Sequence, residues 1–242
     1  MGTVTEHRTA IGTDPVPSFD HLVVVSAHPD DETFGLGGLV SAFVEAGSRV
    51  SLVCLTCGER STLGASCDLA GRRTRELQCA AQVLGISRVT IHHHPDGALD
   101  TVDLDHLVAD VLAGADDADG LLTFDHGGIT GHPDHQRATD VAVAAGRRLG
   151  IPVLAWAIPR EVAERLRDEY GAPFVGREDT EIDHVVTVDR SGQYDAMTCH
   201  GSQLADNPVP RRRIALQGDR EYLRQLSEHR PPSRPTEPIV TF

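Results

Sequence analysis

The sequence predicts an α/β fold: a Rossmann-like, doubly wound and mostly parallel sheet with helices on both faces. Short runs rich in valine, leucine and isoleucine alternate along the chain with longer segments whose apolar residues recur at helical spacing. The first run, residues 21–27, is almost continuously apolar, which is typical of a strand buried on both faces of a parallel sheet. Alternating strands and helices favour this layered architecture, in which ligands bind beyond the carboxyl ends of the strands.

The first half of the chain is expected to contribute three strands and three helices. In chain order we expect a strand at residues 21–27, a helix at 37–46, a strand at 49–56, a helix at 72–84, a strand at 89–92 and a helix at 104–112. Gly85 indicates where the second helix ends, because glycine readily adopts the left-handed conformation that terminates helices.

The second half continues the same alternation. We expect a strand at residues 120–124, a helix at 133–149, a strand at 153–158, a helix at 161–169, a strand at 183–188 and a helix beginning at 192–199. Pro133 fits the first turn of its helix, where the missing N–H costs nothing. After Asn207 the tail holds six of the 14 prolines, so we expect it to wrap the surface with one helix near residues 219–228.

Length and hydrophobic content predict one domain. We expect residues 1–19 to be a flexible lead and residues 20–242 to form a single domain with a proline-rich C-terminal tail. No signal-peptide pattern or membrane-length apolar run is evident, so a cytoplasmic protein is expected. An odd number of unevenly spaced cysteines is then interpreted as reduced thiols: Cys54, Cys57, Cys67, Cys79 and Cys199. The CxxC pair among them, Cys54 and Cys57, is interpreted as buried small hydrophobic residues.

The charge balance narrows the possible partners. The formal net charge is −14, which should repel nucleic acid and anionic membranes. All 22 basic residues are arginine, so lysine chemistry such as Schiff-base formation, a Walker-type phosphate lysine or a Ser-Lys dyad is excluded. A small-molecule substrate remains, and a homo-oligomer is possible.

The strongest chemical signal follows the first predicted strand. Residues 27–32 read Ala-His-Pro-Asp-Asp-Glu, which places one imidazole and three carboxylates within five residues. Such crowding of acids repels itself unless a cation or a reaction uses it. The alternative is a simple turn with an aspartate that caps the next helix.

A second signal follows the strand at residues 120–124. Residues 127–135 read Gly-Gly-Ile-Thr-Gly-His-Pro-Asp-His, a glycine-rich loop in which two histidines flank Pro-Asp before a helix. Alone, this could be a capping loop with an exposed histidine. Because both signals lie at the carboxyl ends of predicted parallel strands, they should meet at one site. Two imidazoles and one carboxylate would supply three ligands to Zn²⁺ and leave a fourth position open.

These two segments resemble the signatures AHPDDE and GHPDH of the LmbE-like (PIG-L) family of zinc-dependent N-acetylglucosaminyl deacetylases and amidases. The resemblance implies His28, Asp31 and His135 as metal ligands and Asp30 as the general base. It also implies that His132 polarises the carbonyl, that Asp134 orients His132 and that Glu32 orients a ligand. The expected cofactor is Zn²⁺, with another divalent metal such as Fe²⁺ possible.

Weaker matches extend the resemblance along the chain. Arg73 in an R-x-x-E helix and Asp96 in a Pro-Asp-Gly loop are implied to contact sugar hydroxyls, although a solvated arginine and a plain turn are the alternatives. Residues 57–59 match a loop beside the family's site, and residues 200–203 match an H-x-S-Q segment that is either near the site or structural. Two positions depart from the family: Gln193 stands where lysine is common, and Thr130 stands where some members carry a mobile tyrosine.

The expected function is hydrolysis of an N-acyl amide, most simply an N-acetyl group on an amino sugar or glycoconjugate. An amidase that cleaves a larger thiol–sugar conjugate is the alternative within the hydrolases. A non-haem Fe(II) oxygenase shares the ligand set of two histidines and one carboxylate, but such enzymes usually use a β-barrel. A nucleotide-binding module is suggested by the glycines at residues 35–38, although these lack the G-x-G-x-x-G spacing.

Overall fold

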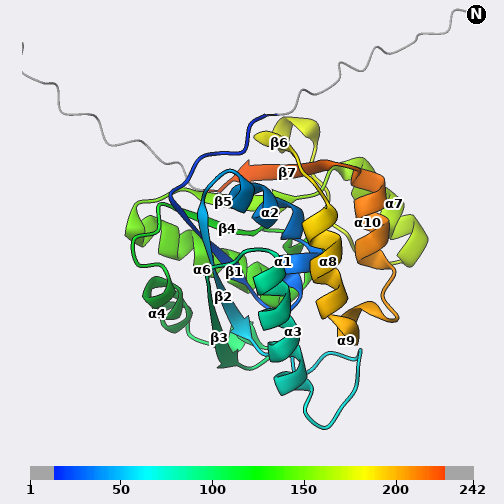
Figure 1. Ribbon diagram of the computed structural model, residues 1–242, viewed down its shortest axis with the longest axis horizontal. Helices are drawn as coiled ribbons and strands as arrows, with labels where there is room; N and C mark the ends of the chain where they lie inside the picture. Colours follow the sequence, from blue (N-terminus) through cyan, green and yellow to red (C-terminus); the bar gives the residue numbers. More distant parts are fainter. Residues whose placement is uncertain (1–13, 227–242) are drawn as a thin grey trace, which may run out of the picture.

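The computed structural model describes residues 14–226, and its centre is a seven-stranded sheet of order β3-β2-β1-β4-β5-β7-β6 (Figure 1). The strands are β1 (His21–Ser26), β2 (Arg49–Thr56), β3 (Arg88–His94), β4 (Gly120–Phe124), β5 (Val153–Ala157), β6 (His184–Thr187) and β7 (Arg220–Gln225). The first five are parallel to one another, and β7 runs antiparallel to both β5 and β6. The predicted doubly wound, mostly parallel sheet is confirmed.

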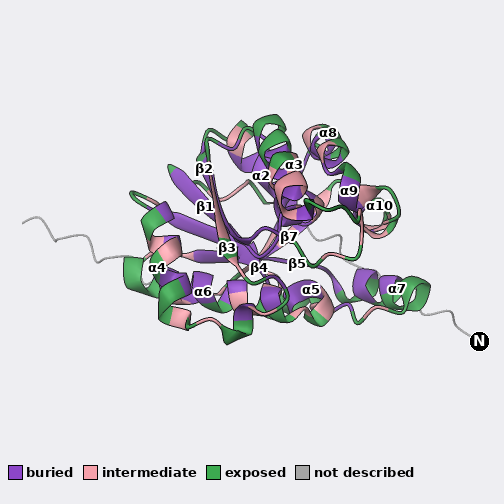
Figure 2. Ribbon diagram, turned by 90° about the horizontal axis from the view of Figure 1, so that it is seen from below, coloured by how far each residue is buried: buried purple, intermediate pink, exposed green. Residues whose placement is uncertain are grey.

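Helices cover both faces of this sheet. They are α1 (Asp31–Phe34), α2 (Gly37–Glu45), α3 (Leu69–Val83), α4 (Leu104–Gly114), α5 (Gly128–Gly131), α6 (Pro133–Leu149), α7 (Arg160–Tyr170), α8 (Ser191–Cys199), α9 (Gly201–Leu204) and α10 (Val209–Gln217), with 3-10 turns η1 (Leu99–Thr101) and η2 (Asp179–Glu181). Figure 2 shows α2, α3 and α8 on one side of the sheet and α4 and α6 on the other. Two hydrophobic clusters correspond to these two sides, one containing Leu39 and Leu77 and the other Leu107 and Val141.

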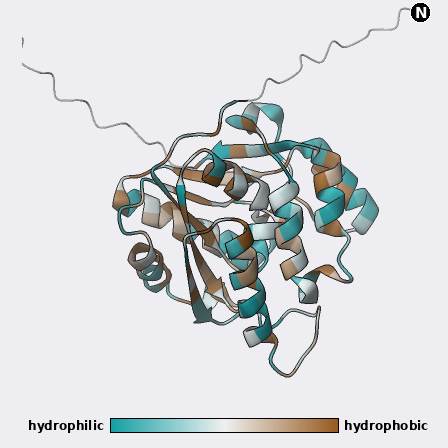
Figure 3. Ribbon diagram, viewed as in Figure 1, coloured by the Kyte–Doolittle hydropathy of each residue, from teal (hydrophilic) through white to brown (hydrophobic). Residues whose placement is uncertain are grey.

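The strands of the parallel part follow from their sequences. All six residues of β1 are buried, as expected for a strand that is covered on both faces. Figure 3 shows the most hydrophobic colouring on the inner strands and the hydrophilic colouring on the outer helix surfaces. The structure starts α3 three residues before the predicted helix, because the side chain of Asp68 accepts a hydrogen bond from the N–H of Gly71 and caps the first turn.

The C-terminal segment departs from the prediction. The helix expected near residues 219–228 is wrong: residues 220–225 form β7, and the helix lies earlier, at α10. Strand β7 has alternating burial, with Glu221 and Leu223 facing inward. Its charged residues give it a hydrophilic colour in Figure 3, and Glu221 is buried because Arg190 and Arg213 pair with its carboxylate. That pairing depends on tertiary structure.

The predicted lead and tail lie partly outside the described residues. Residues 1–13 and 227–242 are not among the residues that the structure describes. The described end of the lead is attached to the domain, since the N–H of Asp14 donates to the carbonyl of Val185 and the ring of Phe19 packs against Phe43.

Candidate metal centre

Two loops leave the sheet side by side, from the carboxyl ends of β1 and β4. These strands are parallel neighbours, and the chain continues from β1 toward β2 on one side of the sheet and from β4 toward β5 on the other. Loops diverge at such a switch point and leave a crevice that is the usual ligand site of this architecture. The β1 loop carries His28, Asp30 and Asp31, and the β4 loop leads into α6 with His132 and His135.

The three predicted ligands converge in space. The Nδ1 of His28 lies 3.2 Å from the Nε2 of His135. The carboxylate of Asp31 lies 3.2 Å from His135 Nε2 and 3.8 Å from His28 Nδ1. Ligand atoms around a tetrahedral zinc ion with bonds of about 2.0–2.1 Å are separated by about 3.3 Å. The three side chains therefore fit one divalent ion.

The ring nitrogens that face away from this triangle have acceptors. The Nε2 of His28 lies 3.1 Å from Asp134 and 3.1 Å from Asp96, and the Nδ1 of His135 lies 3.1 Å from the carbonyl of Gly128. Histidine ligands are commonly oriented in this way, with the second N–H donated to a carboxylate or carbonyl. The arrangement leaves His28 Nδ1 and His135 Nε2 as the metal-facing atoms.

Asp134 takes a different position from the one expected of it. Its buried carboxylate contacts His28 and accepts from the N–H groups of Gly97 and Leu99. His132 instead contacts the backbone of Asp134, whose N–H donates to His132 Nδ1 over 3.2 Å. The Asp134 carboxylate thus orients His28, because Asp134 lies at the start of α6 with its side chain pointing into the domain.

The electrostatics of the cluster favour a cation. Burial opposes protonation of His28, but Asp134 and Asp96, together with the charges of Asp31 and Asp30, raise its pKa to about 10. Burial also opposes ionisation of Asp31, yet His135 and His28 hold its pKa below the usual range. Several buried acids around one point make positive charge favourable there, as a metal ion would supply.

Asp30 lies beside the triangle and outside it. Its backbone has φ 124°, an unfavourable conformation for a residue with a side chain, and its N–H donates to Glu32. Its carboxylate lies 3.0 Å from Arg73. Burial, opposed by Arg73 and aided by Asp31, raises the pKa of Asp30 to about 6. The turn directs Asp31 toward the histidines and leaves Asp30 facing Arg73.

A buried group of residues holds this turn in place. Glu32 accepts from the N–H of Asp30 and from His200 Nε2 over 2.7 Å. These contacts support Asp30, whereas the resemblance had implied that Glu32 orients a metal ligand. His200 opens the H-x-S-Q segment, which therefore lies next to the site. Burial opposes protonation of His200, but Glu32 raises its pKa, which favours an ion pair.

Arg73 and Asp96 also reach the site. The guanidinium of Arg73 is buried and donates to the carbonyls of Gly58 and Pro29 and to Asp30. These contacts support a role in positioning Asp30, and its predicted sugar contact stays a prediction. Asp96 contacts His28 and accepts from the N–H of Arg60.

Two cavities adjoin the predicted ligands. A polar cavity of about 410 Å³ is lined by Asp30, His132 and Arg73, by Gln203, and by four residues that the sequence did not single out: Arg60, Ser61, Leu63 and Asn207. Gln203 lies in the H-x-S-Q segment, whose match was a usable signal. A smaller apolar cavity of about 190 Å³ borders Asp31 and His135 and is lined by Phe34, Phe124, Trp156 and neighbours that include Thr130.

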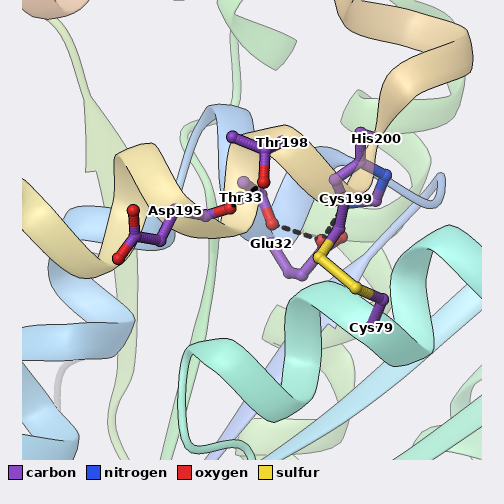
Figure 4. Close-up of a disulfide and its surroundings, with 7 residues drawn as sticks. All are labelled: Glu32, Thr33, Cys79, Asp195, Thr198, Cys199 and His200. Atoms are coloured by element: carbon purple, nitrogen blue, oxygen red, sulfur yellow. Dashed lines mark hydrogen bonds and ion pairs between the residues drawn. A yellow bond between two sulfur atoms is a disulfide. The ribbon is translucent and has the colours of Figure 1, made fainter.

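The cysteines correct one expectation. Cys79 of α3 and Cys199 of α8 form a disulfide (Figure 4), so these two are not the reduced thiols expected. They are 120 residues apart in sequence, and only the packing of α3 against α8 brings them together. Cys199 directly precedes His200, so the disulfide lies next to the His200–Glu32 pair that holds Asp30 in place. The CxxC residues Cys54 and Cys57 are buried, as interpreted from the sequence.

The chain is similar in sequence to known deacetylases. A family model described as GlcNAc-PI de-N-acetylase, PIG-L, matches residues 23–146, which include both loops. The chain is 30% identical to a 1D-myo-inositol 2-acetamido-2-deoxy-alpha-D-glucopyranoside deacetylase from Mycobacterium sp. (strain JLS), over 82% of this chain and 80% of that protein.

Solved structures share the fold at low sequence identity. N,N'-diacetylchitobiose deacetylase from Pyrococcus horikoshii is 18% identical with a TM-score of 0.62, covering 88% of this chain and 85% of that one. A 4-carboxy-2-hydroxymuconate hydratase from Pseudomonas putida KT2440 is equally similar, at 18% identity and a TM-score of 0.61, covering 86% and 96%. The fold therefore accommodates more than one reaction. Within residues 14–226, no helix is both long and apolar enough to cross a membrane.

Proposed function

The chain belongs to the PIG-L family of deacetylases, and from this premise we propose that the two loops form the active site of a zinc-dependent N-deacetylase for amino-sugar compounds. The observation that carries the proposal is the triangle of donor atoms from His28, Asp31 and His135, with Asp30 and His132 beside it. Three ligands leave a coordination position open, which is typical of catalytic zinc sites.

Zn²⁺ bound by these ligands would act as a Lewis acid toward the amide carbonyl and increase the acidity of a nearby water molecule. Asp30 would accept the proton that water loses when its oxygen attacks the carbonyl carbon. When the C–N bond breaks, the same proton passes to the departing amine, and the products are acetate and a free amino group. Arg73 and Glu32 would hold Asp30 in place during both transfers.

In this proposal, His132 interacts with the carbonyl oxygen of the substrate amide. Its Nδ1 accepts the N–H of Asp134, so the neutral ring carries its proton on Nε2. Burial and the neighbouring His135 and His28 lower the pKa of His132, which favours this neutral form. The Nε2–H then donates to the negative charge that develops on the oxygen.

The His132→Ala variant is expected to reduce kcat by about 10²–10³-fold, the usual effect of losing one oxyanion donor, while its metal content stays unchanged. The matched control is His126→Ala, an exposed histidine of the same strand-to-helix connection, which should keep wild-type kinetics. Turnover and bound metal should be measured on the same samples. Wild-type turnover in His132→Ala would remove His132 from the mechanism.

The two cavities suggest how a substrate lies. The polar cavity has the size of an ordinary ligand site and carries donors and acceptors that suit sugar hydroxyls. The apolar cavity, which also borders Asp31 and His135, suits the alkyl part of an acyl group. Thr130 lines this second cavity and obstructs it less than the tyrosine of some family members would.

The function is tested by incubating the protein with N-acetylated sugars and conjugates and measuring free amine and acetate together. We expect kcat/KM to be higher for N-acetylglucosamine attached to an aglycone than for free N-acetylglucosamine, because Arg60 and Asn207 also line the polar cavity and could contact an aglycone. A neutral or cationic aglycone should be preferred, since the chain carries a formal charge of −14. Equal values for free and conjugated sugar would contradict the predicted aglycone contact, and no amine from any amide would contradict the function.

The alternative of a nucleotide-binding module is not supported by the glycines at residues 35–38. A Cβ at Gly35 would lie 2.6 Å from the ring of Phe124, and one at Gly38 would lie 2.5 Å from Arg190. These glycines allow α1 and α2 to pack closely against neighbouring side chains. Packing therefore explains them without a phosphate ligand.

A further inference from the structure

A second group of side chains that could bind a metal lies between β3 and α4, outside the proposed catalytic site. We propose that His92, His94, His106 and Asp110 form a separate site for a divalent transition metal. The proposal does not rest on the proposed function. It uses side chains that the catalytic mechanism leaves out, on elements seen at the lower left of Figure 1.

The backbone brings these residues to one place. His92 and His94 are two apart in β3, so their side chains project from the same face of the strand. Their rings are stacked, with centroids 5.7 Å apart. His106 and Asp110 are four apart in α4, so they share one face of that helix. The strand thus contributes two histidines to the cluster, and the helix contributes one histidine and one aspartate.

The side-chain atoms converge on the carboxylate of Asp110. Its Oδ2 lies 2.7 Å from His94 Nε2, 3.6 Å from His92 Nδ1 and 4.0 Å from His106 Nε2. Ligand atoms of His92, His94 and Asp110 all lie within 4.8 Å of one another. Small side-chain rotations would bring these atoms to similar distances from one ion, and the exposed His106, whose ring lies edge-on to that of His94, could complete the set.

The mixture of imidazole and carboxylate ligands determines which metal ions would bind at this site. Imidazole nitrogen with one carboxylate suits Zn²⁺, Ni²⁺ and Cu²⁺, whereas Mg²⁺ and Ca²⁺ prefer oxygen ligands alone.

An ion here would join the edge strand to the helix. It would also fix the end of β3, from which Pro95 leads to Asp96, and Asp96 lies 3.1 Å from His28. A metal ion bound here would therefore help to hold the loop that carries Asp96 toward the catalytic centre. Binding should also stabilise the folded state, because only the folded chain assembles the site.

The test is metal counting after removal of metal with chelator and dialysis against Zn²⁺ or Co²⁺. The wild type should bind about two ions per chain, and a His28→Ala/His135→Ala double variant, which lacks the proposed catalytic site, should retain about one. Adding His94→Ala should remove that ion. Co²⁺ bound to the double variant should give the visible absorption of a site with nitrogen ligands, and Zn²⁺ should raise its Tm.

His93→Ala is the matched control. His93 lies on the same strand but its side chain faces Cys57, with 3.2 Å between the sulfur and Nδ1, so this variant should keep its metal. His106→Ala, at an exposed position where folding is not at risk, should weaken Zn²⁺ binding by about tenfold or more. If the double variant binds no metal, or if His94→Ala and His93→Ala bind equally, the second site does not exist.

Discussion

Replacing His135 by alanine is expected to remove one metal ion per chain and reduce deacetylation to background. Its Nε2 lies 3.2 Å from both His28 Nδ1 and Asp31, so its loss leaves two ligands and an unbalanced buried carboxylate. Catalysis that depends on the metal should then fall by at least about 10⁴-fold, since the metal's effect on both carbonyl and water is lost together. His28→Ala should behave in the same way.

Metal content and turnover should be measured on one preparation, with Gln136→Ala as the control. Gln136 is the next residue of α6 and is exposed, so its variant should match the wild type in both. Because the β3–α4 site would retain an ion, the comparison is best made in a His94→Ala background. Unchanged metal content in His135→Ala would contradict the ligand assignment, whatever happens to activity.

Asp30→Asn should give the second-largest effect, with a different signature. The amide cannot accept the proton of water, so kcat should fall by about 10²–10⁴-fold, the range attributed to general-base catalysis. Metal should stay bound, because the Asp30 carboxylate pairs with Arg73 and lies outside the triangle of ligand atoms. The similar size of asparagine preserves the turn and its N–H contact with Glu32.

The neighbouring residue provides the matched comparison. Asp31→Asn makes the same chemical change one position later, on the carboxylate that lies 3.2 Å from His135, and should release the metal. Turnover and bound metal in the two variants therefore separate the proposed base from the proposed ligand. If Asp30→Asn lost metal to the same extent as Asp31→Asn, Asp30 would be a ligand and the division of roles would be wrong.

Much of the parallel sheet could be predicted because its signals are local. Strand β1 is a run of buried apolar residues, and α6 begins at a proline in its first turn, so periodicity and turn chemistry were sufficient. Strand β7 could not be predicted in this way. Its inward residue Glu221 is charged, and it is buried only because two arginines from other elements pair with it.

The sequence by itself determined which residue types meet at the switch point of the sheet. Two histidine-rich and acid-rich segments directly follow strands, and parallel strands present their carboxyl ends at one edge, so topology predicted that the segments meet, while the resemblance to the family singled out His28, Asp31 and His135. The disulfide between Cys79 and Cys199 could not be foreseen, because nothing local relates residues 120 positions apart.

Tertiary structure alone decided which neighbours each functional side chain has. Asp134 follows His132 closely in sequence, yet its carboxylate turns inward to His28, and Arg73 donates to Asp30 and two carbonyls. Hydrogen bonds of buried groups are set by the need to satisfy every donor and acceptor in three dimensions. Sequence patterns therefore predicted which residue types lie at this site, whereas packing determined how these residues support one another.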